Sequence, residues 1–267
     1  MTRIALNGLG RIGKLVLRDL IDSGSGGEIV LLNDPVGDAE QHALLMEFDS
    51  VHGRWSTPVS HAPGALVLDG RTVRLSHEKT IEALPLAEMG VDLVIDCTGV
   101  FKTEARIAPY FEAGVKRVVV SAPVKDGGAL NLVYGVNHHL YDGSQRIVTA
   151  ASCTTNCLAP VVKVLHEAIG IRHGSITTIH DVTNTQTIVD RPAKDMRRAR
   201  SAPYARAPGG GRQRALSEAD HMASADVRDV ATSRNPLLKV SSESKPNTVA
   251  GAICNVVREN ARNNPPS

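Results

Sequence analysis

The sequence predicts an α/β protein built on a doubly wound parallel sheet. Short, continuously apolar runs alternate with helical patterns through the first half of the chain, as in strands that are covered on both faces. A glycine-rich turn follows the first apolar run and precedes the first helical pattern, which is typical of strand–helix–strand units. A chain of 267 residues is long enough for one large domain or two of ordinary size.

The elements of the first half can be assigned in order. The predicted strands are Ile4–Leu6, Ile29–Leu32, Leu93–Ile95 and Val118–Val120, and the predicted helices are Ile12–Ile21, Ala39–Met46 and Ala105–Phe111. Asp69-Gly70 lies between two further apolar runs, Leu66–Leu68 and Thr72–Leu75, and this dipeptide favours a tight hairpin. We therefore expect one antiparallel excursion within the parallel series.

The chain changes character after residue 150. The predicted elements there are a strand over Arg146–Ala150, a helix over Ser152–Ile169 despite Pro160, and a strand over Ser175–Ile179. Beyond residue 202 the apolar periodicity is weak, and only Val249–Val257 carries enough apolar residues for a further element. We predict a first domain over residues 1–150, the start of a second, α+β domain over 151–202, and a divergent tail over 203–267.

Composition narrows the function classes. Apolar residues make up 42% of the chain and charged residues 22%, so most of it is expected to fold. The net charge is only +2, and we expect neither nucleic acid nor a membrane surface as a partner. No apolar run reaches the ~18 residues of a membrane helix, and Met1 leads directly into a predicted strand, so a cytoplasmic protein is expected.

Cysteine spacing gives no sign of a metal site or of disulfides. The four cysteines are Cys97, Cys153, Cys157 and Cys254, and they lack the paired spacing of zinc ligands. Disulfides are rare in large intracellular chains. We therefore expect free thiols and no bound metal.

Three glycines, Gly8, Gly10 and Gly13, form a G-x-G-x-x-G turn between the first strand and the first helix. The first permits a tight turn, the second lets the backbone approach a pyrophosphate, and the third allows close packing of helix on strand. The N-terminus of the helix offers N–H groups and the positive end of its dipole to the phosphates. On these residues alone, a purely steric role for the glycines is an equal alternative.

Asp34 strengthens the nucleotide interpretation. It follows the second predicted strand, 21 residues after Gly13, where a carboxylate can accept hydrogen bonds from both ribose hydroxyls. The same carboxylate would repel a 2′-phosphate, so the pattern favours NAD over NADP and predicts a Rossmann-type sheet. The alternative is that Asp34 only caps the turn at Pro35.

Cys153 is the candidate nucleophile. It follows the strand that ends at Ala150 and opens an apolar helix, with Ser152 as the predicted N-cap. A thiol in the first turn lies at the positive end of the helix dipole, which favours the thiolate. Cys157, one turn deeper, and Cys97, after an apolar strand, are interpreted as small buried apolar residues.

His180 is the candidate base. It ends a strand-like segment and precedes polar residues that include Asp181 and Thr183. A reactive thiolate needs a cation or a base beside it, and histidine is the usual partner. Most isolated histidines have surface or structural roles, and the sequence does not show whether His180 contacts Cys153.

Several segments together resemble one family, the phosphorylating glyceraldehyde-3-phosphate dehydrogenases. These segments are NGLGRIG at the first turn, FDSVHGRW (48–55), CTGVF (97–101), SAPVKD (121–126), YGVNH (134–138), SCTTNCLAP (152–160), TTIH (177–180) and DMRRARSA (195–202). The resemblance runs from residue 1 to about 202. Its most specific part is SCTTNC with a histidine 27 residues after Cys153.

The resemblance implies NAD-dependent oxidation of glyceraldehyde 3-phosphate to 1,3-bisphosphoglycerate. Cys153 would carry the substrate as a thiohemiacetal and then a thioester, His180 would accept the hydroxyl proton, and inorganic phosphate would release the product. Ser152 and Thr154 would bind the attacking phosphate, and Thr183 the phosphate of the substrate. The residues that would border the cofactor are Asn7, Gly8, Gly10, Arg11, Ile12, Gly13, Asn33, Asp34, Thr98 and Ser121. Residues 182–202 match the start of a loop that reaches a neighbouring subunit, which implies a homotetramer.

The sequence departs from the family pattern after Ala202. We do not find the family's next features, which are a P-T-x-T-G phosphate segment, an R-V-P strand motif and a late Asn and Tyr. The second domain is therefore expected to be truncated. One alternative is therefore a catalytically impaired remnant that binds NAD. Another is a paralogue, because Ala150 stands where the family usually has Asn and TTIHDVTNTQ looks closer to an arsenic-resistance-associated relative. Arsenate as acyl acceptor or erythrose 4-phosphate as substrate then stays open.

Overall fold

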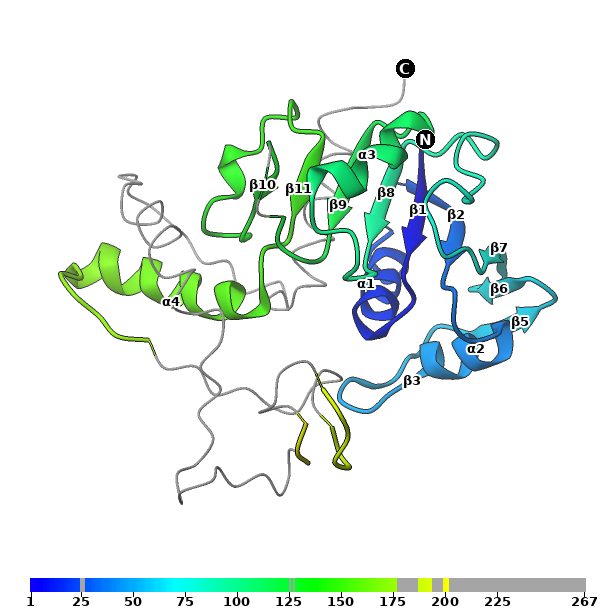
Figure 1. Cartoon of the computed structure of the whole chain (residues 1–267), viewed down its shortest axis with the longest axis horizontal. Helices are drawn as coiled ribbons and strands as arrows, with labels where there is room; N and C mark the ends of the chain where they lie inside the picture. Colours follow the sequence, from blue (N-terminus) through cyan, green and yellow to red (C-terminus); the bar gives the residue numbers. More distant parts are fainter. Residues whose placement is uncertain (25–26, 125, 127, 177–186, 194–198, 202–267) are drawn as a thin grey trace. The chain divides into compact units, whose positions relative to one another are not determined.

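The computed structural model describes residues 1–24, 27–124, 126, 128–176, 187–193 and 199–201 (Figure 1). The helices are α1 (Arg11–Asp22), α2 (Ala39–Glu47), α3 (Glu104–Glu112) and α4 (Cys153–Ile169), with a 3-10 turn at His138–Leu140. The strands are β1 (Thr2–Asn7), β2 (Gly27–Asn33), β3 (Phe48–Asp49), β4 (Gly53–Arg54), β5 (Val59–Ala62), β6 (Ala65–Leu68), β7 (Arg71–Ser76), β8 (Leu93–Asp96), β9 (Arg117–Val120), β10 (Leu130–Asn131) and β11 (Ile147–Thr149).

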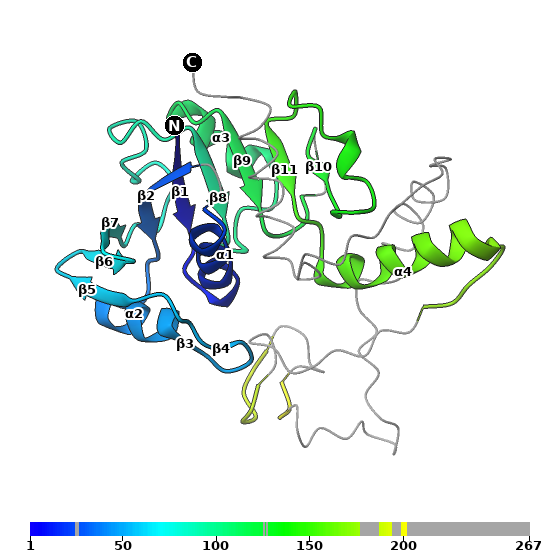
Figure 2. The same cartoon turned by 180° about the vertical axis from the view of Figure 1, so that it is seen from behind.

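Within the described residues, nine strands form one sheet in the order β10-β11-β9-β8-β1-β2-β7-β6-β5. All neighbours from β10 to β7 are parallel, whereas β6 and β5 join antiparallel. From β1 and β2 the chain passes to the edge strand β5, comes back inward through β6 to β7 beside β2, and then crosses to β8 on the other side of β1 (Figures 1 and 2). The predicted α/β fold with a doubly wound parallel sheet is confirmed.

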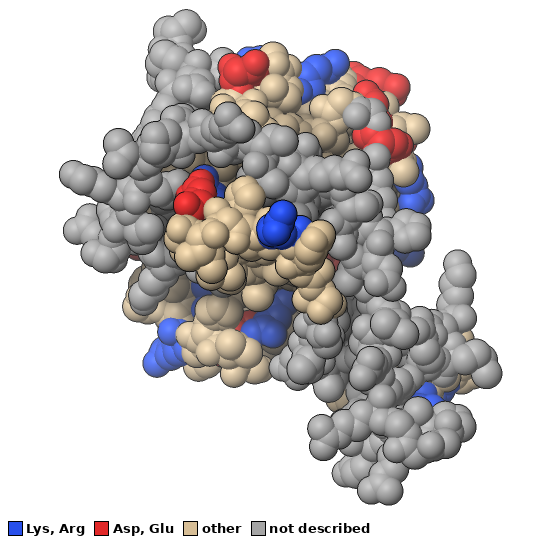
Figure 3. All heavy atoms as spheres, turned by 90° about the vertical axis from the view of Figure 1, so that its left-hand side faces the viewer, with Lys and Arg blue, Asp and Glu red and all other residues tan. Residues whose placement is uncertain are grey.

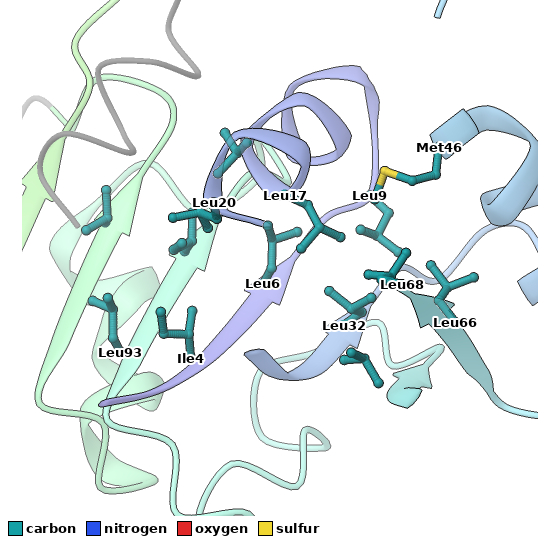
Figure 4. Close-up of a cluster of buried hydrophobic side chains, with 14 of the residues drawn as sticks. Ile4, Leu6, Leu9, Leu17, Leu20, Leu32, Met46, Leu66, Leu68 and Leu93 are labelled. Atoms are coloured by element: carbon teal, nitrogen blue, oxygen red, sulfur yellow. The ribbon is translucent and has the colours of Figure 1, made fainter. Parts of the chain in front are cut away.

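Helices α1 and α3 cover opposite faces of the sheet. Leu17 and Leu20 of α1 share a buried cluster with Leu6 of β1, and Leu9 and Met46 reach the same cluster (Figure 4). On the other face, the α3 residues Ile107 and Tyr110 pack with Ala5, Leu31, Val94 and Val118. Because side chains alternate along a strand, the adjacent residues Ala5 and Leu6 belong to different clusters. Coverage on both faces explains why the strands are continuously apolar.

Local signals set the ends of several elements. Asp38 and Gln41 form a reciprocal capping box at the start of α2, in which Asp38 Oδ1 accepts from the Gln41 N–H at 2.8 Å. Asp69 and Gly70 have φ of 50° and 74°, and this pair of positive φ values forms the predicted tight hairpin between β6 and β7.

The predicted elements agree with the structure to within two residues at each end wherever both lie among the described residues. The short strands β5 and β10 and the β3–β4 hairpin were not predicted. The strand expected over Ser175–Ile179 falls partly outside the described residues, and Val249–Val257 falls wholly outside them.

Residues 1–162 form one compact unit, and a second unit begins at Lys163. In the second unit the described residues include an isolated bridge between Thr187 and Ser201 and an ion pair between Arg200 and Asp190 at 2.9 Å. The domain bounds 1–150, 151–202 and 203–267 stay predictions. On the face drawn in Figure 3, acidic and basic side chains of the described residues are interspersed among uncharged surface. None of the helices in the described part of the chain is long and apolar enough to span a membrane.

Candidate functional site

The parallel strands of the described sheet end in one row, at the edge that their carboxyl ends share. The last residues of adjacent strands pair in register across the sheet and are, in order, Asn131, Thr149, Val120, Asp96, Asn7, Asn33 and Ser76. All except Val120 carry a polar side chain. Ligands of doubly wound sheets bind beyond this edge, at the point where the strand order reverses. The fold therefore gathers polar groups where such a ligand would bind.

A hydrogen-bonded network links the centre of this row. Asn33 Nδ2 donates to Asn7 Oδ1 at 2.8 Å, and Asn7 Nδ2 contacts Tyr110 Oη at 2.6 Å. Tyr110 Oη then donates to Asp96 Oδ2 at 2.8 Å. Asp96 is completely buried, and burial raises its pKa and that of Tyr110. Since each of these four side chains has a hydrogen-bond partner in the network, the network fixes the ends of β1, β2 and β8 relative to one another.

The glycine turn has the geometry that a pyrophosphate requires. Gly8 has φ +97°, and a Cβ there would lie 2.7 Å from the backbone of Cys97. A Cβ on Gly13 would lie 1.9 Å from the Gly8 carbonyl oxygen, so α1 approaches the turn as closely as backbone allows. A Cβ on the exposed Gly10 would meet nothing within 4 Å. The space beside Gly10 is therefore open to a ligand, and the residues present fit NAD.

The start of α1 borders the same open space beside Gly10. Gly10 is the N-cap of α1 and provides no side-chain cap, and the first turn of α1 contains no acidic residue. N–H groups and the positive dipole end consequently face the open space without a competing carboxylate of the same turn.

Asp34 lies at the carboxyl end of β2, half-buried, beside the glycine turn. Its Oδ2 accepts from the Leu9 N–H at 2.7 Å, and its Oδ1 accepts from the Val36 N–H at 3.0 Å. The second bond is the local turn bond that the capping alternative predicts. The first bond ties the carboxylate to the glycine turn, where a ribose acceptor is needed.

A buried pair of basic groups supports the glycine turn from below. Lys14 Nζ donates to the Leu9 carbonyl and lies 3.2 Å from His42 Nδ1, while His42 Nε2 lies 2.9 Å from the Val36 carbonyl oxygen. Burial lowers the pKa of Lys14. Burial and the charge of Lys14 lower the pKa of His42. The Leu9 peptide group is thus held on both sides, by Asp34 at its N–H and by Lys14 at its carbonyl.

Thr98 and Ser121 follow the next strands along the same edge. Asp96 Oδ1 accepts from the Thr98 N–H at 3.0 Å and from its hydroxyl at 2.7 Å, and the Ser121 N–H donates to the Asp96 carbonyl at 2.8 Å. Cys97, predicted to be buried, is half-buried and packs against the core. Burial, with the Asp96 charge, raises the pKa of the Cys97 thiol to about 12, so this thiol stays protonated.

Arg11 is exposed on the first turn of α1 and is engaged by another segment. Its Nε and Nη2 bind the two carboxylate oxygens of Asp49 at 3.1 Å each, and this contact lowers the pKa of Asp49. The bidentate pair ties α1 to the β3–β4 hairpin. Ile12 next to it is 37% exposed and presents apolar surface beside the glycine turn.

Cys153 is the first residue of α4 and is exposed. The predicted N-cap is confirmed, because Ser152 Oγ accepts from the Thr155 N–H at 3.1 Å. The same Ser152 hydroxyl lies 2.8 Å from Thr155 Oγ1. Thr154 is half-buried in the same turn. An accessible thiol therefore stands at the capped N-terminus of a helix, directly after β11.

The prediction that Cys157 is buried is wrong, because the structure exposes it. Asn156 and Ala159 are the buried residues of α4, whereas Val161 and Val164 are 56% and 60% exposed. The apolar pattern correctly predicts a helix here. The pattern does not show which of the apolar side chains in the helix are buried.

His180 and Thr183 lie outside the described residues. The contact between His180 and Cys153, and the phosphate role of Thr183, stay predictions. The loop over 182–202 lies in part outside the described residues as well. The residues expected to border the cofactor, by contrast, lie at or just beyond the carboxyl ends of β1, β2, β8 and β9, at one edge of the sheet.

Sequence reasoning missed Tyr110, Asp96, Lys14 and His42. Tyr110 counts as an apolar member of the α3 pattern, and its hydroxyl finds partners on two strands distant in sequence. A signal existed for Asp96, since a carboxylate at the end of a continuously apolar strand must be paired when buried. No comparable signal marks the pair Lys14 and His42 in the sequence.

Comparison with known proteins identifies the relatives of the chain. Residues 2–104 match the sequence model of the glyceraldehyde 3-phosphate dehydrogenase NAD binding domain, and residues 152–259 match that of the C-terminal domain of the same dehydrogenase. The second match extends beyond residue 202, where the resemblance by motifs ends. The description of the first domain confirms the prediction of NAD as cofactor.

Whole relatives show the same similarity. A glyceraldehyde-3-phosphate dehydrogenase 3 from a Nostoc species is 50% identical over 207 residues, which are 77% of this chain and 61% of the relative. The glyceraldehyde-3-phosphate dehydrogenases of Pseudomonas aeruginosa and Xanthobacter flavus are 45% and 44% identical, again over 77% of this chain and over 62% and 61% of their own lengths. The chain thus spans about three fifths of the length of the curated relatives it matches. The two domain matches together cover more than half of the chain, and the chain belongs to the glyceraldehyde 3-phosphate dehydrogenase family.

Proposed function

We propose that the chain catalyses the NAD-dependent oxidation of glyceraldehyde 3-phosphate to 1,3-bisphosphoglycerate through a thioester on Cys153. The observation that carries this proposal is the exposed Cys153 at a capped helix N-terminus, directly after a strand of the sheet that bears the glycine turn. The helix dipole favours the thiolate, and a thiolate is the nucleophile that covalent aldehyde oxidation requires.

Two side chains, those of Cys153 and His180, would carry out the chemical steps. The Cys153 thiolate adds to the aldehyde carbon and forms a thiohemiacetal. His180 accepts the proton of its hydroxyl as the carbon loses a hydride, and the substrate is left as a thioester. When bound, NAD supplies the hydride acceptor. An oxygen of inorganic phosphate then attacks the thioester carbon, the acyl phosphate leaves, and the Cys153 thiolate is restored.

The binding roles follow the same edge of the sheet. Gly8, Gly10 and Gly13 with the start of α1 would hold the pyrophosphate of NAD, and Asp34 would accept from the ribose hydroxyls. The other residues proposed to border the cofactor are Asn7, Arg11, Ile12, Asn33, Thr98 and Ser121. The hydroxyls of Ser152 and Thr154 would bind the attacking phosphate, and that of Thr183 the substrate phosphate.

NADH formation from glyceraldehyde 3-phosphate, NAD and phosphate by the purified chain tests this function. We expect turnover that Cys153→Ser abolishes and Cys157→Ser leaves intact, because only the first-turn thiol forms the thioester. Turnover that persists in Cys153→Ser, or that is lost equally in Cys157→Ser, contradicts the assignment.

A catalytically impaired NAD-binding remnant is the second candidate. The observation that favours it is the departure of the sequence from the family motifs after Ala202, where part of the phosphate-binding set is not found. Iodoacetate separates the two: a live nucleophile is alkylated selectively at Cys153 near neutral pH, whereas a remnant shows labelling no faster than a free thiol.

Substrate, acceptor and assembly are tested separately. Rates of NADH formation with glyceraldehyde 3-phosphate and with erythrose 4-phosphate give the substrate preference. Each aldehyde is assayed with phosphate and with arsenate, because the two anions share charge and shape and only the rates distinguish them as acceptors. We also propose a homotetramer, which light scattering of the purified chain tests. A monomer would remove the neighbouring subunit from the proposed site.

A further inference from the structure

The backbone immediately before Cys153 has an unusual conformation. Ala151 has φ of 54°, and Asp69 in the β6–β7 hairpin is the other non-glycine residue with positive φ among the described residues. Side chains disfavour this left-handed region, and such residues persist only where surrounding contacts fix them. Asp69 belongs to a tight turn that requires this conformation, whereas Ala151 lies buried between β11 and α4. Ala151 therefore needs another explanation.

Side chains of two residues hold this turn by bonding the peptide group that precedes Ala151 and the carbonyl of Ser152, the next residue. The Ala151 N–H donates to Thr149 Oγ1 at 3.0 Å. Asn156 Nδ2 donates to the Ala150 carbonyl at 2.7 Å and to the Ser152 carbonyl at 2.9 Å. Every one of these bonds closes within the segment that leads from the strand into the helix.

The two side chains are themselves fixed. Thr149 is completely buried, and its hydroxyl donates to Asn131 Oδ1 at 2.6 Å, so a lone pair of Oγ1 is left to face Ala151. Asn156 is 8% exposed and lies in the first turns of α4. Both of its acceptors are carbonyls, so the amide must present its nitrogen and a carboxylate cannot replace it.

The turn controls where the thiol stands. Cys153 comes two residues after Ala151, and Ser152 between them caps α4 through the Thr155 N–H. A change of φ at Ala151 would redirect the chain as it enters α4 and move the first turn, on which Cys153 is carried. Asn156 reaches back from inside the helix to bond both carbonyls that flank Ala151.

We propose that Asn156 and Thr149 are positioning residues for the nucleophile: they hold the left-handed turn at Ala151 and thereby keep Cys153 at the N-terminus of α4. Neither is proposed to touch substrate. The inference rests on the proposed function insofar as Cys153 is the nucleophile. The same two side chains would govern any thiol chemistry at Cys153.

The chain contains its own controls for a test by alkylation. Iodoacetamide is reacted with the folded 267-residue chain near neutral pH, and the rate at each cysteine is measured by peptide mass spectrometry. Cys157 is exposed one helical turn beyond Cys153 and reports on changes to α4 in general. Cys97, whose burial keeps the thiol protonated, reports on opening of the sheet unit. The readout is the ratio of the Cys153 rate to the Cys157 rate.

Asn156→Asp is the primary variant, because it keeps the shape and places an oxygen against two carbonyl oxygens. We expect the ratio to fall by about tenfold while Cys97 stays protected, since the thiol loses its place at the dipole end. An unchanged ratio with Cys97 protected overturns the inference. A ratio near one already in the unmodified chain would instead contradict the proposed nucleophile, so the two failures are distinguishable.

Thr149→Val and Thr149→Ser keep the test decisive if Asn156→Asp does not fold. Valine matches the shape of threonine and removes the acceptor for the Ala151 N–H, whereas serine retains the hydroxyl. We expect the ratio to fall in Thr149→Val and to recover in Thr149→Ser. Equal ratios in both variants, with Cys97 protected, would show that the hydroxyl does not act through the turn.

Discussion

His42 is a titratable residue whose charge the fold does not accept. Its Nδ1 faces the Lys14 ammonium and its Nε2 faces the Val36 carbonyl, which is the pattern of a neutral imidazole with its proton on Nε2. Protonation would set two cations against each other in a buried site. Burial and Lys14 accordingly lower the pKa of His42 from 6.5.

The first prediction is therefore a loss of stability in acid that His42 causes. The unfolded chain titrates His42 near 6.5 and the folded chain at lower pH, so below 6.5 the unfolded state binds more protons. The free energy of unfolding should rise with pH up to about 6.5 and then level. Denaturant titrations across this range measure it. His42→Gln, which can donate to Val36 and accept from Lys14, should flatten the slope, and an unaltered slope would exclude His42 as its cause.

The second prediction concerns the order in which thiols oxidise. Peroxide attacks the thiolate, and the pKa of Cys97 near 12 leaves almost none at neutral pH, whereas Cys153 is exposed at a helix N-terminus. Mild peroxide should modify Cys153 first, as followed by mass spectrometry of the peptides. Earlier modification of Cys97 in the folded chain would contradict the proposed reactive thiol.

Single residues differ in how well the sequence marks them. The glycine turn and the position of Asp34 beside it could be predicted because the constraint is local, a turn between a strand and a helix at fixed spacing, whereas their binding roles stay predictions. Tyr110 could not, because its hydroxyl is satisfied by Asn7 and Asp96 across the sheet. Cys157 was placed on the wrong side because helical periodicity does not state which face is covered.

The strand–turn–helix unit of β1 and α1 contains one glycine that packing requires and another that lies beside open space. Gly13 contacts the Gly8 carbonyl so closely that an added Cβ would lie 1.9 Å from it, whereas an added Cβ on Gly10 meets no protein atom within 4 Å. Gly13 is thus required by the packing of the protein itself, whereas Gly10 leaves space for the proposed cofactor.

The third prediction uses this pair. Gly13→Ala should lower the free energy of unfolding by about 1–3 kcal/mol or more, because α1 must move away from the turn. Gly10→Ala should leave stability nearly unchanged and weaken NAD binding. Thermal melts give the first quantity and calorimetric titration with NAD gives the second. Equal effects of both substitutions on stability would contradict the separation.

Element boundaries could be predicted where an apolar run or a cap defines them. The central strands and the helices α1 to α4 agree with the sequence to within two residues. The two-residue strands β3, β4 and β10 are too short to show a period, and β5 alternates only weakly. These elements form because a neighbouring strand offers its edge, which is a tertiary effect that propensity does not contain.

For the whole molecule, NAD should act as a stabiliser of the sheet unit. A ligand that binds only the folded chain raises the free energy of unfolding by about 2.7 kcal/mol at a concentration of 100 times its Kd. The fourth prediction is that NAD raises the melting temperature and NADP does so much less, because Asp34 repels a 2′-phosphate. Asp34→Asn, which keeps the shape, should narrow the difference between the two nucleotides. Equal shifts with the unmodified chain would remove Asp34 as the discriminating group.

At this scale the sequence predicts the architecture of the sheet unit, because the alternation of apolar runs and helices admits few topologies. It predicts the candidate site only where cofactor and nucleophile motifs are local. The supporting contacts of Asn156 and Thr149 depend on a left-handed turn at Ala151, and an alanine in a sequence does not indicate a positive φ. The catalytic pairing of Cys153 with His180 stays a prediction, since His180 lies outside the described residues.

The polar ends of the parallel strands have a consequence for assembly of the sheet during folding. Six of the seven in-register terminal residues are polar, and side chains of adjacent ends bond directly in three pairs: Asn33 with Asn7, Ser76 with Asn33, and Thr149 with Asn131. A slip of one residue between two strands would turn an asparagine or aspartate to the opposite, leucine-rich side. A misaligned sheet would lose these bonds at the junctions of β1 with β2, β2 with β7 and β10 with β11, so the polar side chains at the proposed ligand edge also favour one strand alignment.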